Sequence, residues 1–200
     1  QDGTDNIVAP YINGQTAYYY PANPEDRGPY NERNRGAAAS ALLMESGDPA
    51  LMGRQPMSVL CSAAPWWREH LPEVVRDHYR RWGMRGAYID YFMNFHTCYA
   101  RDHDHKPGGG DYLIRSKIYQ LRRMRELLAR EGMADFAIAM ESVCGPYTAE
   151  TNLSYRHMFA NWAAVKESEA IPYFEWVFDN IKYYRVTCHG AGSHAEITGL

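Results

Sequence analysis

Two carboxylates end two apolar segments of the chain, and together they could cleave a glycosidic bond. Asp90 ends the run at 86–90, and Glu141 ends the run at 134–141. In a parallel α/β fold all strands present their carboxyl ends at one edge, so neighbouring strands bring such residues together. Cleavage needs one carboxylate that attacks the anomeric carbon and one carboxylic acid that protonates the leaving oxygen. We therefore predict Asp90 as the nucleophile and Glu141 as the acid/base.

The spacing of strands favours a reaction with retention of configuration. Neighbouring strands lie about 5 Å apart, and retaining glycosidases hold their two carboxyl groups about 5–5.5 Å apart. A structural alternative stays open on the residues alone, because Asp90 or Glu141 could instead cap the following helix or pair with an arginine.

Aromatic and polar residues near the predicted strand ends are candidates for binding a sugar. The C–H faces of a sugar ring stack on aromatic rings, and its hydroxyls need paired donors and acceptors. Trp66, like other tryptophans of the chain, could equally be a packing residue. The candidates are Tyr11, Asn13, Trp66, Tyr88, Asn94, His96, His103, His105 and Glu175.

A histidine-rich loop invites comparison with a metal site. Imidazole and carboxylate groups can bind Zn²⁺, but the loop lacks an HExxH motif and the cysteines form no CxxC pair. We therefore expect a solvated or sugar-contacting loop, with no metal and no cofactor, and Cys61 as a buried small hydrophobic residue. The histidines and acids of the loop are His96, Asp102, His103, Asp104 and His105; the four cysteines are Cys61, Cys98, Cys144 and Cys188.

Composition excludes several classes of protein. With 200 residues, 46% hydrophobic and 22% charged, the chain can bury one substantial core. The net charge of −3 and the spread of basic residues leave no electrostatic footprint for nucleic acid or an anionic membrane. No apolar stretch reaches the roughly 18–20 residues of a membrane helix. A small carbohydrate ligand fits these properties better.

The elements that must position these residues alternate along the chain. Such alternation predicts a parallel α/β sheet with right-handed crossovers. Expected strands lie at 6–13, 57–63, 86–92, 134–142 and 171–178, and expected helices at 37–45, 69–82, 112–130 and 155–167.

Five strands are fewer than the eight of a closed barrel. We therefore expect residues 1–200 to form a single domain that is the central part of a (β/α)8 TIM barrel. A small open α/β sheet is the alternative, although no glycine-rich phosphate loop follows any predicted strand. The chain starts at Gln1 rather than Met, which indicates a processed form or a piece of a longer protein. Compartment and oligomeric state stay open.

Four motifs carry a resemblance to a known family. They are WWREHLPEVV at 66–75, GAYIDY at 86–91, CYARDHDHKPGGG at 98–110 and AMES at 139–142. In this order they resemble the barrel core of glycoside hydrolases that carry a domain of unknown function. The resemblance extends from about residue 7 to about residue 180, and the loop at 98–110 is its most specific part.

The motifs are similar, more distantly, to the α-amylase and endo-α-N-acetylgalactosaminidase group. That resemblance implies an Asp nucleophile on the fourth barrel strand and a Glu acid/base on the fifth, which correspond to Asp90 and Glu141. Tyr88 stands where the amylase pattern has an arginine, and this departure weakens the amylase-type assignment. The expected function is a retaining glycoside hydrolase; the alternative is a carbohydrate-binding or structural barrel segment without turnover.

Overall fold

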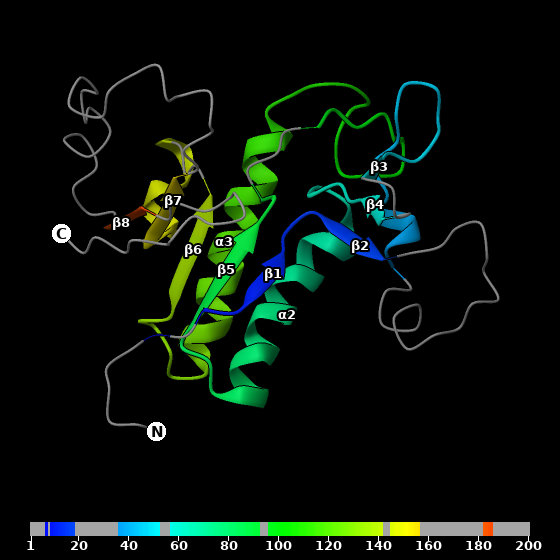
Figure 1. Ribbon diagram of the computed structural model, residues 1–200. Coiled ribbons are helices and arrows are strands. Elements are labelled where there is room, and N and C mark those ends of the chain that lie inside the picture. The colour runs from blue at the N-terminus through cyan, green and yellow to red at the C-terminus, as the bar shows by residue number, and fades with distance from the viewer. Residues whose placement is uncertain are drawn as a thin grey trace, which may run out of the picture.

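The computed structural model describes residues 7, 9–18, 36–52, 57–92, 96–141, 145–156 and 182–185. Within these residues the chain forms a mixed α/β structure with one parallel and one antiparallel sheet (Figure 1). Two long helices cover one face of the parallel sheet. The antiparallel sheet lies beyond the carboxyl end of the first strand of the parallel sheet. Among the helices described, none has the length and apolar character needed to cross a membrane.

The parallel sheet has the strand order β1-β5-β6-β7-β8. All four neighbouring pairs are parallel, as expected when helices or loops connect successive strands. Its strands are β1 (Tyr11–Asn13), β5 (Gly86–Asp90), β6 (Ala137–Glu141), β7 (Leu153–Arg156) and β8 (Lys182–Arg185).

Helices α2 (Pro65–Trp82) and α3 (Tyr112–Arg130) agree with the predicted ranges 69–82 and 112–130. Pro65 occupies the first turn of α2, where its missing N–H costs no hydrogen bond, and Gly83 ends the helix with a left-handed φ of 65°. Apolar residues at helical spacing pack onto the sheet. The core includes Leu71 and Val75 of α2, Leu121, Met124 and Leu128 of α3, and Ile89, Ile138 and Met140 of the sheet.

The antiparallel sheet corrects one prediction about the first part of the chain. Its strands are β2 (Thr16–Tyr18), β3 (Leu51–Met52) and β4 (Met57–Val59), in the order β2-β4-β3. The segment 57–63 was expected to be a parallel barrel strand, but β4 pairs antiparallel on both sides. The residues of β4 alone do not reveal the direction of pairing, because it depends on two partner strands of two or three residues each.

Two predicted helices also differ from the structure. At 37–45 only a short 3₁₀ helix forms, η1 (Ala38–Ser40), after which Ala41 and Leu43 make isolated bridges. At 155–167 the first two residues belong to β7, which follows η2 (Gly145–Glu150) and pairs with β6 and β8. In so short a segment, hydrogen bonds to the neighbouring strands determine the secondary structure more strongly than the local sequence pattern does. The rest of that predicted helix, 157–167, and the predicted strand 171–178 lie outside the described residues.

Candidate active site

The face of the parallel sheet opposite the helices carries the two acids. Ala87 and Ile89 of β5 pack into the helix-covered core, so the alternation of a strand turns Tyr88 and Asp90 to the other face. The same alternation places Glu141 of β6 on that face. Ile89 pairs with Met140 in the register of β5 and β6, and Asp90 and Glu141 come one residue further on. The two carboxylates therefore lie at the same level on adjacent strands.

Three polar groups lie within hydrogen-bond distance of the Asp90 carboxylate. The phenol of Tyr11 donates to Oδ2 at 2.7 Å, the backbone N–H of Tyr91 donates to Oδ1 at 2.8 Å, and the Tyr88 phenol lies 3.4 Å from Oδ1. Asp90 itself is 9% exposed. A buried carboxylate is stable only with such donors, and these donors fix its orientation at the end of β5.

The hydroxyl of Tyr88 lies between the two acids. It donates to Glu141 Oε1 at 2.7 Å and lies 3.4 Å from Asp90 Oδ1, so these two carboxylate oxygens can be no more than 6.1 Å apart. Inverting glycosidases place a water between carboxyl groups separated by about 6.5–9.5 Å. The upper limit of 6.1 Å between Asp90 Oδ1 and Glu141 Oε1 is shorter than that range.

The surroundings of Tyr88 and Tyr11 raise the pKa of both phenols. Burial, the hydrogen bond to Glu141 and the negative charge of Asp90 raise the pKa of the Tyr88 phenol. Burial and the hydrogen bond to Asp90 likewise raise the pKa of Tyr11. Both phenols therefore stay protonated, and can donate to a carboxylate, at alkaline as well as neutral pH.

The turn that follows Asp90 is held in an uncommon backbone conformation. Tyr91 has φ 56°, a left-handed value that non-glycine residues adopt only where neighbouring contacts impose it. Those contacts include the N–H of Gly14, which donates to Asp90 O at 2.8 Å. The buried ammonium of Lys117 donates to Phe92 O. The position of Asp90 is thus fixed from both sides.

Asn13 lies beside Asp90 in the register of β1 and β5. Its side-chain oxygen accepts the backbone N–H groups of Gln15 at 3.1 Å and Thr16 at 2.8 Å. An Asn side chain that accepts N–H groups two and three residues ahead stabilises a turn. In this structure Asn13 shapes the β1–β2 connection next to Asp90.

The structure places Trp66 in a packing environment. Its ring stacks on His70 with centroids 4.2 Å apart and an interplanar angle of 18°, and it contacts the buried core. A Cβ built on Gly36 would lie only 2.1 Å from the ring, so the backbone at Gly36 covers Trp66 closely. None of its described contacts is with Asp90 or Glu141.

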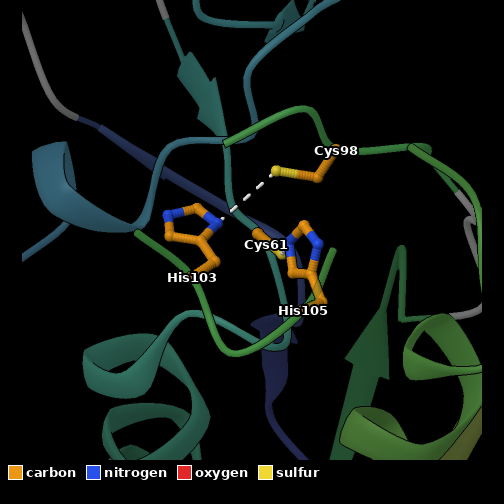
Figure 2. A group of neighbouring side chains, drawn as sticks. All are labelled: Cys61, Cys98, His103 and His105. Carbon is orange, nitrogen blue, oxygen red and sulfur yellow. Dashed lines mark hydrogen bonds between the residues drawn. The ribbon is translucent and has the colours of Figure 1, made fainter. Parts of the chain in front are cut away.

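His103 and His105 gather with two cysteines rather than with the carboxylates (Figure 2). His103 Nδ1 lies 3.5 Å from Cys98 Sγ, and His105 Nε2 lies 3.4 Å from Cys61 Sγ. The complete group was not predictable from local sequence, because Cys61 lies 37 positions before Cys98. The signal that could have found it was the His-x-His pair only five residues after Cys98.

Of the remaining predicted site residues, the structure describes His96 but not Asn94 or Glu175. His96 is exposed at the start of the loop that follows β5. Asn94 and Glu175 lie outside the described residues, so their placement stays a prediction. The role of Lys117 was not predictable from the sequence, because a lysine on an amphipathic helix normally faces solvent.

The fold resembles that of a known glycosidase. The chain is similar to the α-N-acetylgalactosaminidase NagBb from Bifidobacterium bifidum in complex with GalNAc, with a TM-score of 0.58 and 13% identity over 94% of this chain and 28% of that one. The ligand-free form of the same enzyme gives a TM-score of 0.53 with 12% identity, over 93% of this chain and 29% of that one. At such identities the likeness concerns the fold.

Residues 7–187 match the family described as "Domain of unknown function (DUF6259)", and the chain belongs to this family. A Bacteroides thetaiotaomicron protein named "Putative glycoside hydrolase" is 34% identical over 135 residues, which are 64% of this chain and 19% of that protein. The chain thus spans about a fifth of the length of this relative.

Proposed function

We propose that the chain contributes the catalytic pair of a retaining O-glycoside hydrolase, with Asp90 as the nucleophile and Glu141 as the acid/base. The observation that carries this proposal is the position of the Tyr88 hydroxyl between the two carboxylates. It contacts Asp90 Oδ1 and Glu141 Oε1, so these two oxygens lie no more than 6.1 Å apart. The five parallel strands, together with a fold similar to 28% of a larger glycosidase, support a further proposal, that residues 1–200 form one part of a (β/α)8 barrel.

The reaction proceeds in two displacements. In the first, a carboxylate oxygen of Asp90 bonds to the anomeric carbon while the glycosidic bond breaks, and Glu141 gives its proton to the leaving oxygen. In the second, the Glu141 carboxylate takes a proton from water, whose oxygen attacks the anomeric carbon and releases Asp90. The sugar keeps its anomeric configuration because it is inverted twice.

The surrounding donors suit these roles. Tyr11 and the N–H of Tyr91 orient the Asp90 carboxylate through one hydrogen bond to each oxygen. Tyr88 can donate to Asp90 while a protonated Glu141 donates to the Tyr88 oxygen, and it can donate to Glu141 once that proton has left. The Tyr88 hydroxyl would therefore change its hydrogen-bond partner when Glu141 loses or regains its proton.

Asp90→Asn and Glu141→Gln in the full-length protein test this proposal. Activity is measured against a panel of aryl glycosides that starts with α-linked N-acetylgalactosamine, the sugar named for the similar B. bifidum enzyme. We expect Glu141→Gln to lower kcat by roughly 10²–10⁴-fold and Asp90→Asn to lower it at least as much. Asp135→Asn is the matched control, because Asp135 is exposed and pairs with Arg85.

Two outcomes would contradict the catalytic assignment. The first is turnover at the wild-type rate in both variants. The second is saturable sugar binding without hydrolysis by the wild-type protein, which would favour a carbohydrate-binding segment. Azide rescue supplies a positive sign: Asp90→Ala with azide should release a glycosyl azide of inverted configuration, because azide then replaces the missing nucleophile.

A further inference from the structure

Four side chains of types that bind metals converge between the small sheet and the loop after β5. Cys61 follows β4, and Cys98, His103 and His105 belong to the loop between β5 and α3. One ligand atom from each residue lies within 4.8 Å of the other three. In Figure 2 the four side chains point toward a common centre. Neither the carboxylate pair nor its proposed reaction uses this group.

The observed distances match the edges of a zinc tetrahedron. Zn–S bonds of about 2.3 Å and Zn–N bonds of about 2.0–2.1 Å at tetrahedral angles place sulfur and nitrogen about 3.6 Å apart. Cys61 Sγ lies 3.4 Å from His105 Nε2, and Cys98 Sγ lies 3.5 Å from His103 Nδ1. Both sulfur–nitrogen contacts therefore already have the separation that one shared ion requires.

Backbone carbonyls orient both imidazole rings for coordination. His103 Nε2 lies 3.0 Å from Ala39 O, and His105 Nδ1 lies 2.7 Å from Lys106 O. A carbonyl oxygen only accepts hydrogen bonds, so each of these nitrogens carries the proton in the neutral ring. His103 Nδ1 and His105 Nε2 then have free lone pairs directed at the cysteines. Metal-binding histidines commonly have such a carbonyl partner on the second nitrogen.

The loop that carries three of the ligands is fixed by its own contacts. Cys98 forms an isolated bridge with Gly108, and the Tyr112 hydroxyl accepts from Cys98 N and donates to Gly108 O. The His105 ring stacks on Tyr112 with centroids 3.8 Å apart and an interplanar angle of 5°. The ligands are thus held near their coordinating positions by protein contacts.

The chemistry of the two thiols also suits a metal. Both cysteines are free and buried. Two thiolates and two neutral imidazoles form the donor set typical of a structural zinc site.

We propose that Cys61, Cys98, His103 and His105 bind one Zn²⁺ in a closed site that fastens the β5–α3 loop to the small sheet. Four protein ligands fill the tetrahedral shell, so the ion has a structural role and no open position for a substrate. This proposal replaces two expectations from the sequence, that the loop binds no metal and that His103 and His105 contact a sugar. It does not depend on the glycosidase proposal.

The direct test measures metal in the full-length protein purified without chelator. We expect one zinc per chain by inductively coupled plasma mass spectrometry and, after exchange into Co²⁺, the thiolate-to-cobalt charge-transfer band and the intense d–d bands of a tetrahedral site. No stoichiometric metal, together with no uptake of Zn²⁺ or Co²⁺ by the reduced protein, would overturn the proposal. A Cys61–Cys98 disulfide in protein whose thiols were blocked at lysis would overturn it equally.

Two variants and a control locate the site. Cys98→Ser should weaken Co²⁺ binding at least tenfold and remove most of the charge-transfer band. His105→Cys should keep one metal per chain and strengthen that band, because it adds a third thiolate; this variant keeps the test valid if Cys98→Ser does not fold. His78→Asn, on α2, should bind Co²⁺ like the wild type. Equal Co²⁺ spectra in the wild type and both site variants would contradict the assignment.

Discussion

Tyr88 donates a hydrogen bond of 2.7 Å to Glu141 across two neighbouring parallel strands. The same hydroxyl lies 3.4 Å from Asp90, two residues further along its own strand. Strand alternation and parallel register thus bring one phenol between two carboxylates that are 51 positions apart in the chain. Because Tyr88 contacts both acids, substituting it tests the proposed chemistry while both carboxylates stay in place.

Tyr88→Phe should lower kcat by roughly 10- to 100-fold while the fold is retained. A hydrogen bond to a charged group contributes about 1.5–3 kcal/mol, and about 1.4 kcal/mol corresponds to tenfold in rate. Steady-state kinetics on the best glycoside of the panel measure the change. Tyr119→Phe is the matched control, because Tyr119 also donates to a carboxylate, Glu69, but at an exposed position. Equal losses in both variants would contradict a specific role for Tyr88.

Alkaline pH should destabilise the protein partly through Tyr88. Its pKa is raised above the ordinary value of 10.0 in the folded state, so the unfolded chain loses this proton first. The contribution of Tyr88 to the free energy of unfolding is therefore complete below about pH 10, and it is lost as the pH rises toward the folded-state pKa of Tyr88. Urea unfolding across this range should give a shallower decline for Tyr88→Phe than for the wild type. Parallel declines would show that Tyr88 does not contribute.

Gly14→Ala should destabilise the protein by about 1–3 kcal/mol, the usual cost of overpacking. A Cβ at this position would lie 2.7 Å from Ile89 Cγ2 and 3.0 Å from Asp90 O. The backbone carrying Asp90 would have to move, so we also expect lower glycosidase activity. Gly109→Ala is the control, since its Cβ would meet nothing within 4 Å. Urea denaturation compares the two, and similar midpoints would contradict the close approach at Gly14.

Lys117→Met should cost about 1–3 kcal/mol because it leaves the Phe92 carbonyl without this donor. Lys117 is 2% exposed, and its Nζ lies 5.3 Å from the centroid of the Phe92 ring. Methionine keeps much of the apolar stem, so the loss reports mainly on the ammonium. Lys106→Met, at an exposed position, should leave the free energy of unfolding unchanged. Equal urea midpoints for the two variants would show that Lys117 does not fix the turn after Asp90.

Long periodic elements were predictable from the sequence, and short ones were not. The spacing of apolar residues in α2 and α3 predicts the residues that the structure buries in the core. The strands that end at Asp90 and Glu141 were predictable from their apolar runs, which the helices cover. The direction of β4 depends on partners of two or three residues, which have no period of their own.

The carboxylate pair and the cysteine–histidine group differ in the same way. Asp90 and Glu141 occupy equivalent positions in successive strands, so a rule about parallel sheets predicts that they lie together. Cys61 joins Cys98, His103 and His105 only because the loop after β5 lies against the end of β4. No local spacing encodes that contact, and a search for CxxC pairs could not find it.

In the proposed mechanism Asp90 forms a covalent glycosyl intermediate, with Glu141 as the acid/base. The most direct measurement is peptide mapping by mass spectrometry after the full-length protein reacts with a 5-fluoroglycosyl fluoride of the sugar that it releases. We expect one added sugar per chain, located on Asp90, and its accumulation in Glu141→Gln as well as in the wild type. A label on another residue, or turnover with inversion and no label, would contradict it.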